Sequence, residues 1–205
     1  MKATPEDRPA AGAAAGAWMR LFIAVEAAQQ VRDALSAAQD ALRKAGADIR
    51  WVDPGRMHLT LVFLGDVEAV RAPELEPALD ACCASVVAFE MEAAGLGFFG
   101  RADAPRVIWA GIGDGSAAVS ALQAQIRAAV LALGFKLEDR AFSAHLTLGR
   151  SRSARNGAAL ARALALNSKA FGRTLVERAL LMRSELTPAG PVYSILHEAR
   201  LKARA

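Results

Sequence analysis

The sequence predicts a protein of mixed strands and helices, built from one structural unit used twice. Short apolar segments alternate with amphipathic ones along the 205 residues, and the tetrapeptide His-Leu-Thr-Leu occurs at His58 and again at His145. The two histidines are 87 residues apart, and the apolar segments that open the two units, at Leu21 and Val107, are 86 residues apart. Spacings that agree within one residue indicate an internal duplication.

The first unit opens with an apolar run at Trp18 that predicts a buried strand. Apolar residues then recur every three or four positions from Val31 to Ala45, which predicts a helix, and Gly46 follows as its C-terminal cap. Further along we expect a strand at 49–52, a turn at 53–55, a strand at 57–64, a helix over about 73–83 and strands within 86–99.

The second unit repeats this order. An apolar strand at 106–112 precedes a helical stripe from Val119 to Leu133, and Gly134 is the cap. The remaining expectations are a short strand at 135–137, a strand at 142–150, a helix at 157–166 and two closing strands at 174–185 and 192–201.

Composition predicts one folded domain over residues 18–205 behind a disordered tail, residues 1–17. Two adjacent cysteines, Cys82 and Cys83, exclude a disulfide scaffold and favour a reducing cytoplasm. The chain has no apolar run of about 18 residues, so we expect no membrane span. The net charge of +4 suits a phosphate-bearing partner but equally a solvated basic surface.

The repeated motif carries the predicted chemistry. Alternate residues of a strand share a face, so each histidine lies beside its threonine while the leucines face the core. One neutral and one protonated histidine can take a proton from an attacking water and give one to a leaving oxygen. The hydroxyls of Thr60 and Thr147 can donate to phosphate oxygens. Arg150 is a further candidate phosphate ligand, although its odd spacing from His145 places it on the opposite face of an ideal strand.

Other candidate residues receive structural interpretations. Three histidines without metal-ligand spacing predict no metal site, and we expect no cofactor. His197 is interpreted as a strand-end histidine outside the site. Trp18, Trp51 and Trp109 are expected in the core.

The chain resembles the RNA 2′,3′-cyclic phosphodiesterase family, also called the 2′-5′ RNA ligase family, of the two-histidine phosphoesterase superfamily. The resemblance spans about residues 18–202. The segments that carry it are 20–24 (RLFIA), 50–52 (RWV), 58–65 (HLTLVFLG), 134–135 (GF), 139–148 (DRAFSAHLTL) with Arg150, and 183–186 (RSEL).

Membership implies an α+β fold of two lobes whose antiparallel sheets face a central cleft, with helices outside. It implies metal-independent hydrolysis of an RNA terminal 2′,3′-cyclic phosphate to a 2′-phosphate, with tRNA fragments among the candidate substrates. His58 is then the proton donor and His145 the acceptor, although near symmetry allows the reverse. Nothing in the sequence requires a second chain, so we expect a monomer.

Three alternatives remain open on the sequence alone. The same residues would serve 2′-5′ RNA ligation, in which RNA ends are joined through a 2′-5′ bond. The fold could also be a non-catalytic RNA- or nucleotide-binding module, although both motifs are intact. The modest net charge also leaves room for a phosphodiesterase of small cyclic nucleotides.

Overall fold

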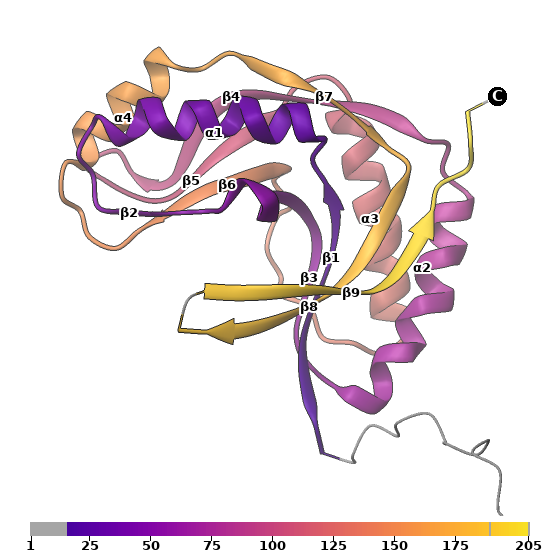
Figure 1. Ribbon diagram of the computed structural model, residues 1–205. Coiled ribbons are helices and arrows are strands. Elements are labelled where there is room, and N and C mark those ends of the chain that lie inside the picture. The colour runs from indigo at the N-terminus through magenta and orange to yellow at the C-terminus, as the bar shows by residue number, and fades with distance from the viewer. Residues whose placement is uncertain (1–15, 189, 205) are drawn as a thin grey trace, which may run out of the picture.

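The computed structural model describes residues 16–188 and 190–204, and its strands form one curled antiparallel sheet (Figure 1). The strands are β1 (Trp18–Glu26), β2 (Ile49–Trp51), β3 (His58–Glu68), β4 (Phe89–Arg101), β5 (Ala104–Ile112), β6 (His145–Ser151), β7 (Ala170–Val176), β8 (Arg178–Thr187) and β9 (Gly190–Arg200). The helices are α1 (Gln29–Arg43), α2 (Leu75–Ala84), α3 (Ser116–Ala132) and α4 (Gly157–Leu166), with short 3-10 helices η1 (Pro54–Arg56) and η2 (Ala69–Glu74). Residues 1–15 of the expected tail lie outside the described residues.

The strand order is symmetric about the centre of the sheet. It reads β7-β4-β5-β6-β3-β1-β8-β9, and β2 pairs with the free stretch of β6. The two central strands, β6 and β3, each carry one His-Leu-Thr-Leu motif and are joined through the pair Leu59–Leu146. We call β3, β1, β8 and β9 the His58 half, and β6, β5, β4, β7 and β2 the His145 half. This order supports the duplication expected from the sequence.

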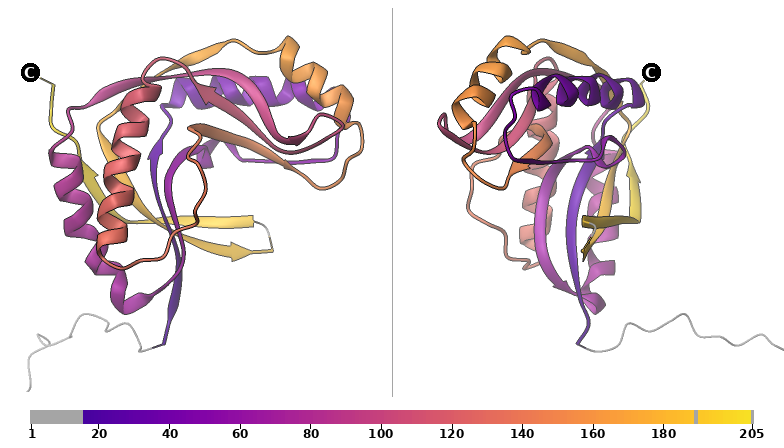
Figure 2. Two further views of the ribbon diagram at one scale, coloured as in Figure 1. Left: turned by 180° about the vertical axis from the view of Figure 1, so that it is seen from behind. Right: turned by 60° about the vertical axis from the view of Figure 1, so that its left-hand side comes forward.

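The helices cover one face of the sheet. Helices α1 and α3 each pack against strands of the half to which the strand before them in sequence does not belong. Helix α2 packs against β8 and β9, and α3 packs against β3 and also contacts β4, whereas α1 and α4 pack against the His145 half (Figures 1 and 2). Thus α1 directly follows β1 in sequence but covers the other half, and α3 follows β5 but packs against β3. None of the helices within the described residues is long and apolar enough to cross a bilayer.

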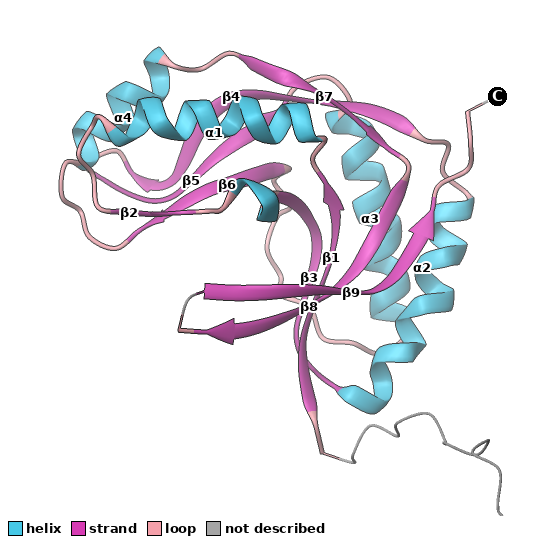
Figure 3. Ribbon diagram, viewed as in Figure 1, coloured by secondary structure: helices cyan, strands magenta, loops and turns pink. Residues whose placement is uncertain are grey.

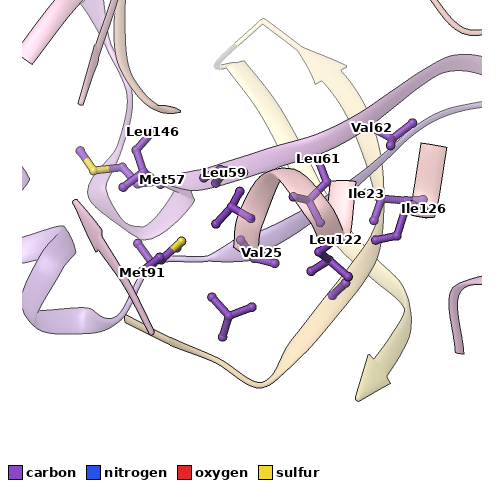
Figure 4. Close-up of a cluster of buried hydrophobic side chains, with 14 of the residues drawn as sticks. Ile23, Val25, Met57, Leu59, Leu61, Val62, Met91, Leu122, Ile126 and Leu146 are labelled. Atoms are coloured by element: carbon purple, nitrogen blue, oxygen red, sulfur yellow. The ribbon is translucent and has the colours of Figure 1, made fainter. Parts of the chain in front are cut away.

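A single hydrophobic core lies between the sheet and the helices. The motif leucines Leu59 and Leu146 are fully buried there, in a cluster that also contains Leu122 of α3 (Figure 4). The apolar stripe of α1 that predicted a helix is the buried face of that helix. Because the leucines point to the helices, the alternating histidines and threonines point to the helix-free face.

The structure confirms the α+β class and most elements, with three differences (Figure 3). The two expected sheets are joined into one. No strand forms at 135–137, where the described chain between α3 and β6 is irregular. The expected strand at 174–185 is two strands, because the chain turns at Glu177, whose carbonyl accepts a hydrogen bond from the Leu201 amide at 2.8 Å. Trp18 is exposed, against expectation.

Candidate active site

The two motifs meet at the centre of the sheet. Leu59 and Leu146 are directly opposite in the antiparallel β3–β6 ladder. That register places His58 opposite Thr147 and Thr60 opposite His145. Side chains on the same face of neighbouring strands lie beside one another, so the two histidines and the two threonines are neighbours on this face. Four of the five predicted site residues therefore share one small area of the helix-free face.

The same local device orients both imidazole rings. Nδ1 of His58 is 2.8 Å from the Arg56 carbonyl oxygen, and Nδ1 of His145 is 2.7 Å from the Ser143 carbonyl oxygen. Each acceptor lies two residues before its histidine. A carbonyl can only accept, so Nδ1 carries the proton in both rings, and Nε2 is the atom left for acid–base chemistry.

The turn predicted at Asp53-Pro54-Gly55 holds the first acceptor in place. Asp53 caps η1, and its Oδ1 accepts a hydrogen bond from the Gly55 amide at 2.8 Å. This short helix ends at Arg56, which brings the Arg56 carbonyl within hydrogen-bond distance of Nδ1 of His58. The turn chemistry read from the sequence therefore has a direct role in aiming a histidine.

Aromatic rings enclose both histidines on the helix-free face. His58 stacks on Phe22 with centroids 4.9 Å apart, and Tyr193 meets it edge-on at 5.3 Å. Phe99 meets His145 edge-on at 5.1 Å, with Trp109 beside it at 6.4 Å. These rings lie against the imidazoles and limit their exposure to water.

Burial lowers the pKa of both histidines below the ordinary value. The carbonyl hydrogen bonds oppose this shift in both rings. The nearby charges differ: Glu26 raises the pKa of His58, whereas Arg150 and Arg140 lower that of His145. The charge of His145 also lowers the pKa of His58, so the two imidazoles interact electrostatically.

A β-bulge brings Arg150 to the same face as the histidines. In the β5–β6 ladder, the neighbours Trp109 and Ile108 pair with Thr147 and Gly149, which leaves Leu148 as an extra residue. The extra residue reverses the alternation beyond it. Leu148 and Gly149 are both buried, and Arg150 is exposed. Arg150 therefore lies on the same face as His145 in spite of its odd spacing. The expectation from an ideal strand, which placed it on the opposite face, is wrong.

A buried glutamine supports this bulge. Gln39 of α1 is 2% exposed, and its Nε2 donates to the carbonyls of Leu148 at 2.9 Å and Val52 at 2.8 Å. The Leu148 carbonyl also accepts from the Val52 amide at 2.8 Å. Gln39 thus ties α1 to the irregular segment that precedes Arg150, a role that helix periodicity alone did not indicate.

Sequence reasoning missed Tyr193 and expected Trp109 in the core, whereas Trp109 lies beside His145. Tyr193 is the only tyrosine of the chain, which is the one sequence signal that could have singled it out. By contrast, His197 lies where it was expected, outside this group: its Nε2 is 2.8 Å from Asp80 of α2. Within residues 16–188 and 190–204, no three His, Cys, Asp or Glu side chains gather as a metal site would require.

Solved structures share this architecture. A crystal structure of a Thermus thermophilus protein aligns with a TM-score of 0.75 at 30% identity, over 91% of this chain and 100% of that one. Escherichia coli LigT, crystallised in complex with 3′-AMP, aligns with a TM-score of 0.75 at 23% identity, over 90% of this chain and 99% of that one. The latter likeness establishes the fold alone. The fold is thus that of the LigT-type phosphoesterases.

Sequence comparison gives the family. The family model described as LigT like phosphoesterase matches residues 25–109 and 112–193, so the chain belongs to the LigT-like phosphoesterases. A relative named RNA 2′,3′-cyclic phosphodiesterase, from Methanothermobacter thermautotrophicus, is 34% identical over 184 residues, which cover 89% of this chain and 99% of the relative. A relative of the same name from Aeropyrum pernix is 32% identical over 169 residues, covering 81% of this chain and 94% of the relative.

Proposed function

We propose that this phosphoesterase hydrolyses the 2′,3′-cyclic phosphate at the end of an RNA to a 2′-phosphate and a free 3′-hydroxyl. One observation carries the proposal: two imidazoles share one face of the sheet, each with Nδ1 fixed on a carbonyl and with the threonine of the other motif opposite. A phosphorus atom between them can be reached from two sides. The name shared by the relatives supports the choice of a cyclic phosphodiester.

The proposed step needs one base and one acid. Nε2 of His145 takes a proton from water as its oxygen attacks phosphorus. The bond between phosphorus and the 3′-oxygen breaks, and the 3′-oxygen takes the proton from Nε2 of His58. The product carries the phosphate on the 2′-oxygen, and the two histidines have exchanged protonation states. A proton passed back through solvent restores the starting enzyme.

The surrounding charges support this assignment of roles. Glu26 favours the protonated form of His58, whereas Arg150 and Arg140 favour the neutral form of His145. These charge effects act in the sense that the acid role of His58 requires, while burial lowers the pKa of both rings.

The remaining groups stabilise charge on the phosphate. The hydroxyls of Thr60 and Thr147 can donate to the two non-bridging oxygens, because each lies on the same face as both histidines. Arg150, turned to that face by the bulge at Leu148, adds a cationic donor. With an acid, a base and a cation supplied by the chain, we propose that the reaction needs no metal ion.

The test is a reaction with an RNA oligonucleotide that ends in a 2′,3′-cyclic phosphate, with EDTA present. Nuclease digestion followed by chromatography against 2′- and 3′-nucleotide standards identifies the new end. The proposal expects a 2′-phosphate from the native protein and none from the His58→Ala/His145→Ala double variant. A 3′-phosphate product, or activity lost in EDTA and restored by a divalent ion, contradicts the proposed mechanism.

Ligation can be measured in the same reaction mixture. The same groups would serve 2′-5′ ligation if a 5′-hydroxyl RNA replaced water, but water is by far the more abundant nucleophile. Adding an RNA with a 5′-hydroxyl end and measuring the joined product against the hydrolysed one gives the ratio directly. We expect hydrolysis to dominate.

A further inference from the structure

Two arginine side chains meet at the tip of the β8–β9 hairpin. Nη1 of Arg56 donates to the Pro191 carbonyl at 2.8 Å. A methyl group built on Gly190 would lie 2.7 Å from Nη2 of Arg50 and 3.4 Å from Nη1 of Arg56, so both guanidinium groups lie beside the same point of the hairpin. In Figure 1 this hairpin extends below β2, which carries Arg50.

A third arginine adjoins this pair. Arg50 is directly opposite Arg150 in the β2–β6 ladder, so their side chains share a face. Among the residues that the structure describes, none of Arg50, Arg56 and Arg150 forms an ion pair with a carboxylate. Neighbouring cations repel one another, and an anion between them would remove that cost.

The arginines adjoin the proposed catalytic pair. Arg56 lies two residues before His58, and Tyr193 lies edge-on to His58. Burial raises the pKa of Tyr193, and the positive charges of Arg150 and Arg56 both lower it, which places this phenol within reach of both cations. A chain of phosphates leaving the site toward the hairpin would therefore meet Arg50 and Arg56 next.

We propose that Arg50 and Arg56 bind the internucleotide phosphate that precedes the terminal nucleotide, and so select RNA ends over free cyclic mononucleotides. This inference rests on the proposed function, since it presumes that the cyclic phosphate lies between the histidines. Guanidinium groups suit the task because their planar donors match two phosphate oxygens at once. Arg150 remains with the reacting phosphate.

The test compares two substrates that end in the same nucleoside 2′,3′-cyclic phosphate. One is the mononucleotide and the other a dinucleotide, and the measured quantity is the ratio of their kcat/KM values at low salt. The native protein should favour the dinucleotide by about 10- to 100-fold, the factor expected for a hydrogen bond to a charged group. Arg50→Gln and Arg56→Gln should each reduce the ratio by about tenfold or more. Arg162→Gln, a matched change of an exposed arginine on α4 behind the sheet, should leave the ratio as it is.

A modified substrate makes the same test without mutation. A dinucleotide with an uncharged methylphosphonate linkage should react with native protein at a kcat/KM close to that of the mononucleotide. A native ratio near one, a full ratio with the uncharged linkage, or a full ratio in Arg50→Gln each overturns the arginine site while leaving hydrolysis in place. If the native protein turns over none of these substrates, the proposed function itself fails, and the arginine site fails with it.

Discussion

The His58 half and the His145 half present the same motif in different electrostatic surroundings. Both use a carbonyl two residues earlier to hold Nδ1, and both contain a bulge at the residue that follows the motif threonine, Leu61 in one half and Leu148 in the other. The residue two positions beyond the bulge reaches the helix-free face in each half, but it is Phe63 in one and Arg150 in the other. Phe63 is 39% exposed and lies under the guanidinium of Arg20.

This difference shows how a duplicated scaffold can acquire two roles. The backbone geometry that aims the imidazoles is common to both halves. The nearby charges are not, because Glu26 raises the pKa of His58 whereas Arg150 lowers that of His145. Under the proposed function, the shared backbone geometry positions the two imidazoles, and a few nearby side chains influence which of them donates a proton and which accepts one.

Removing either histidine should have the largest effect. His58→Ala and His145→Ala should each lower kcat by about 10²- to 10⁴-fold, the usual contribution of one general acid or base. The double variant should be little worse than either single variant, because both groups act on one transition state. Steady-state kinetics on a cyclic-phosphate RNA measures this, with His197→Ala as the control expected to retain activity. Full activity in His145→Ala would end the proposed mechanism.

The pH profile tests the shared proton. Under the proposed function, the active free enzyme has one proton on the pair of histidines, and burial lowers both pKa values from about 6.5. The singly protonated population is therefore greatest below about pH 6.5. As the pH rises, that proton is lost and kcat/KM should fall by up to about tenfold per pH unit. The bound phosphate anion favours protonation, so the kcat optimum should lie at higher pH than that of kcat/KM. A flat profile from pH 5 to 9 contradicts the proposal.

Replacing Arg150 removes the charge that distinguishes the His145 half from the His58 half. Arg150→Gln should lower kcat/KM by about 10- to 100-fold, through loss of a charged hydrogen bond to the phosphate. It should also raise the pKa of His145, because the arginine charge lowers it. Phe63→Leu is the matched change at the equivalent position and should alter kcat/KM by less than about threefold, since neither side chain can donate to phosphate. Equal losses in both variants would mean that Arg150 acts only through packing.

The smallest expected effect concerns the support of the bulge. Gln39→Met removes two buried hydrogen bonds and should lower the free energy of unfolding by about 1–3 kcal/mol. Urea unfolding measures this, and Gln125→Met, at an exposed glutamine of α3, is the control. If Gln39 also positions Arg150, the variant should lose kcat/KM at a temperature where it is fully folded. Unchanged stability would show that these carbonyls find other donors.

The sequence predicted what depends on local pattern. The histidine–threonine face, the leucine core and the α1 stripe follow from strand and helix periodicity, and the turn at Asp53 follows from its residues. The face of Arg150 could not be predicted, since one extra residue at Leu148 reverses the alternation and its support comes from Gln39, more than 100 residues away. The turn at Glu177 carries no glycine or proline, and Tyr193 reaches His58 only through the packing of the β8–β9 hairpin.

The exchange of helices between the halves has a consequence for how the chain folds. Helix α1 is made early in the sequence, yet it packs against β7, and α3 from the second half of the sequence packs against β3. Neither the first nor the second half of the sequence can bury the apolar face of its helix until the other half is present. A fragment that ends after β4 would leave the apolar face of α1 exposed to water. A fragment that starts at β5 would do the same to the apolar face of α3. We therefore expect the chain to fold as one cooperative unit despite its repeated plan, so that the two histidine motifs come together only when the whole chain has folded.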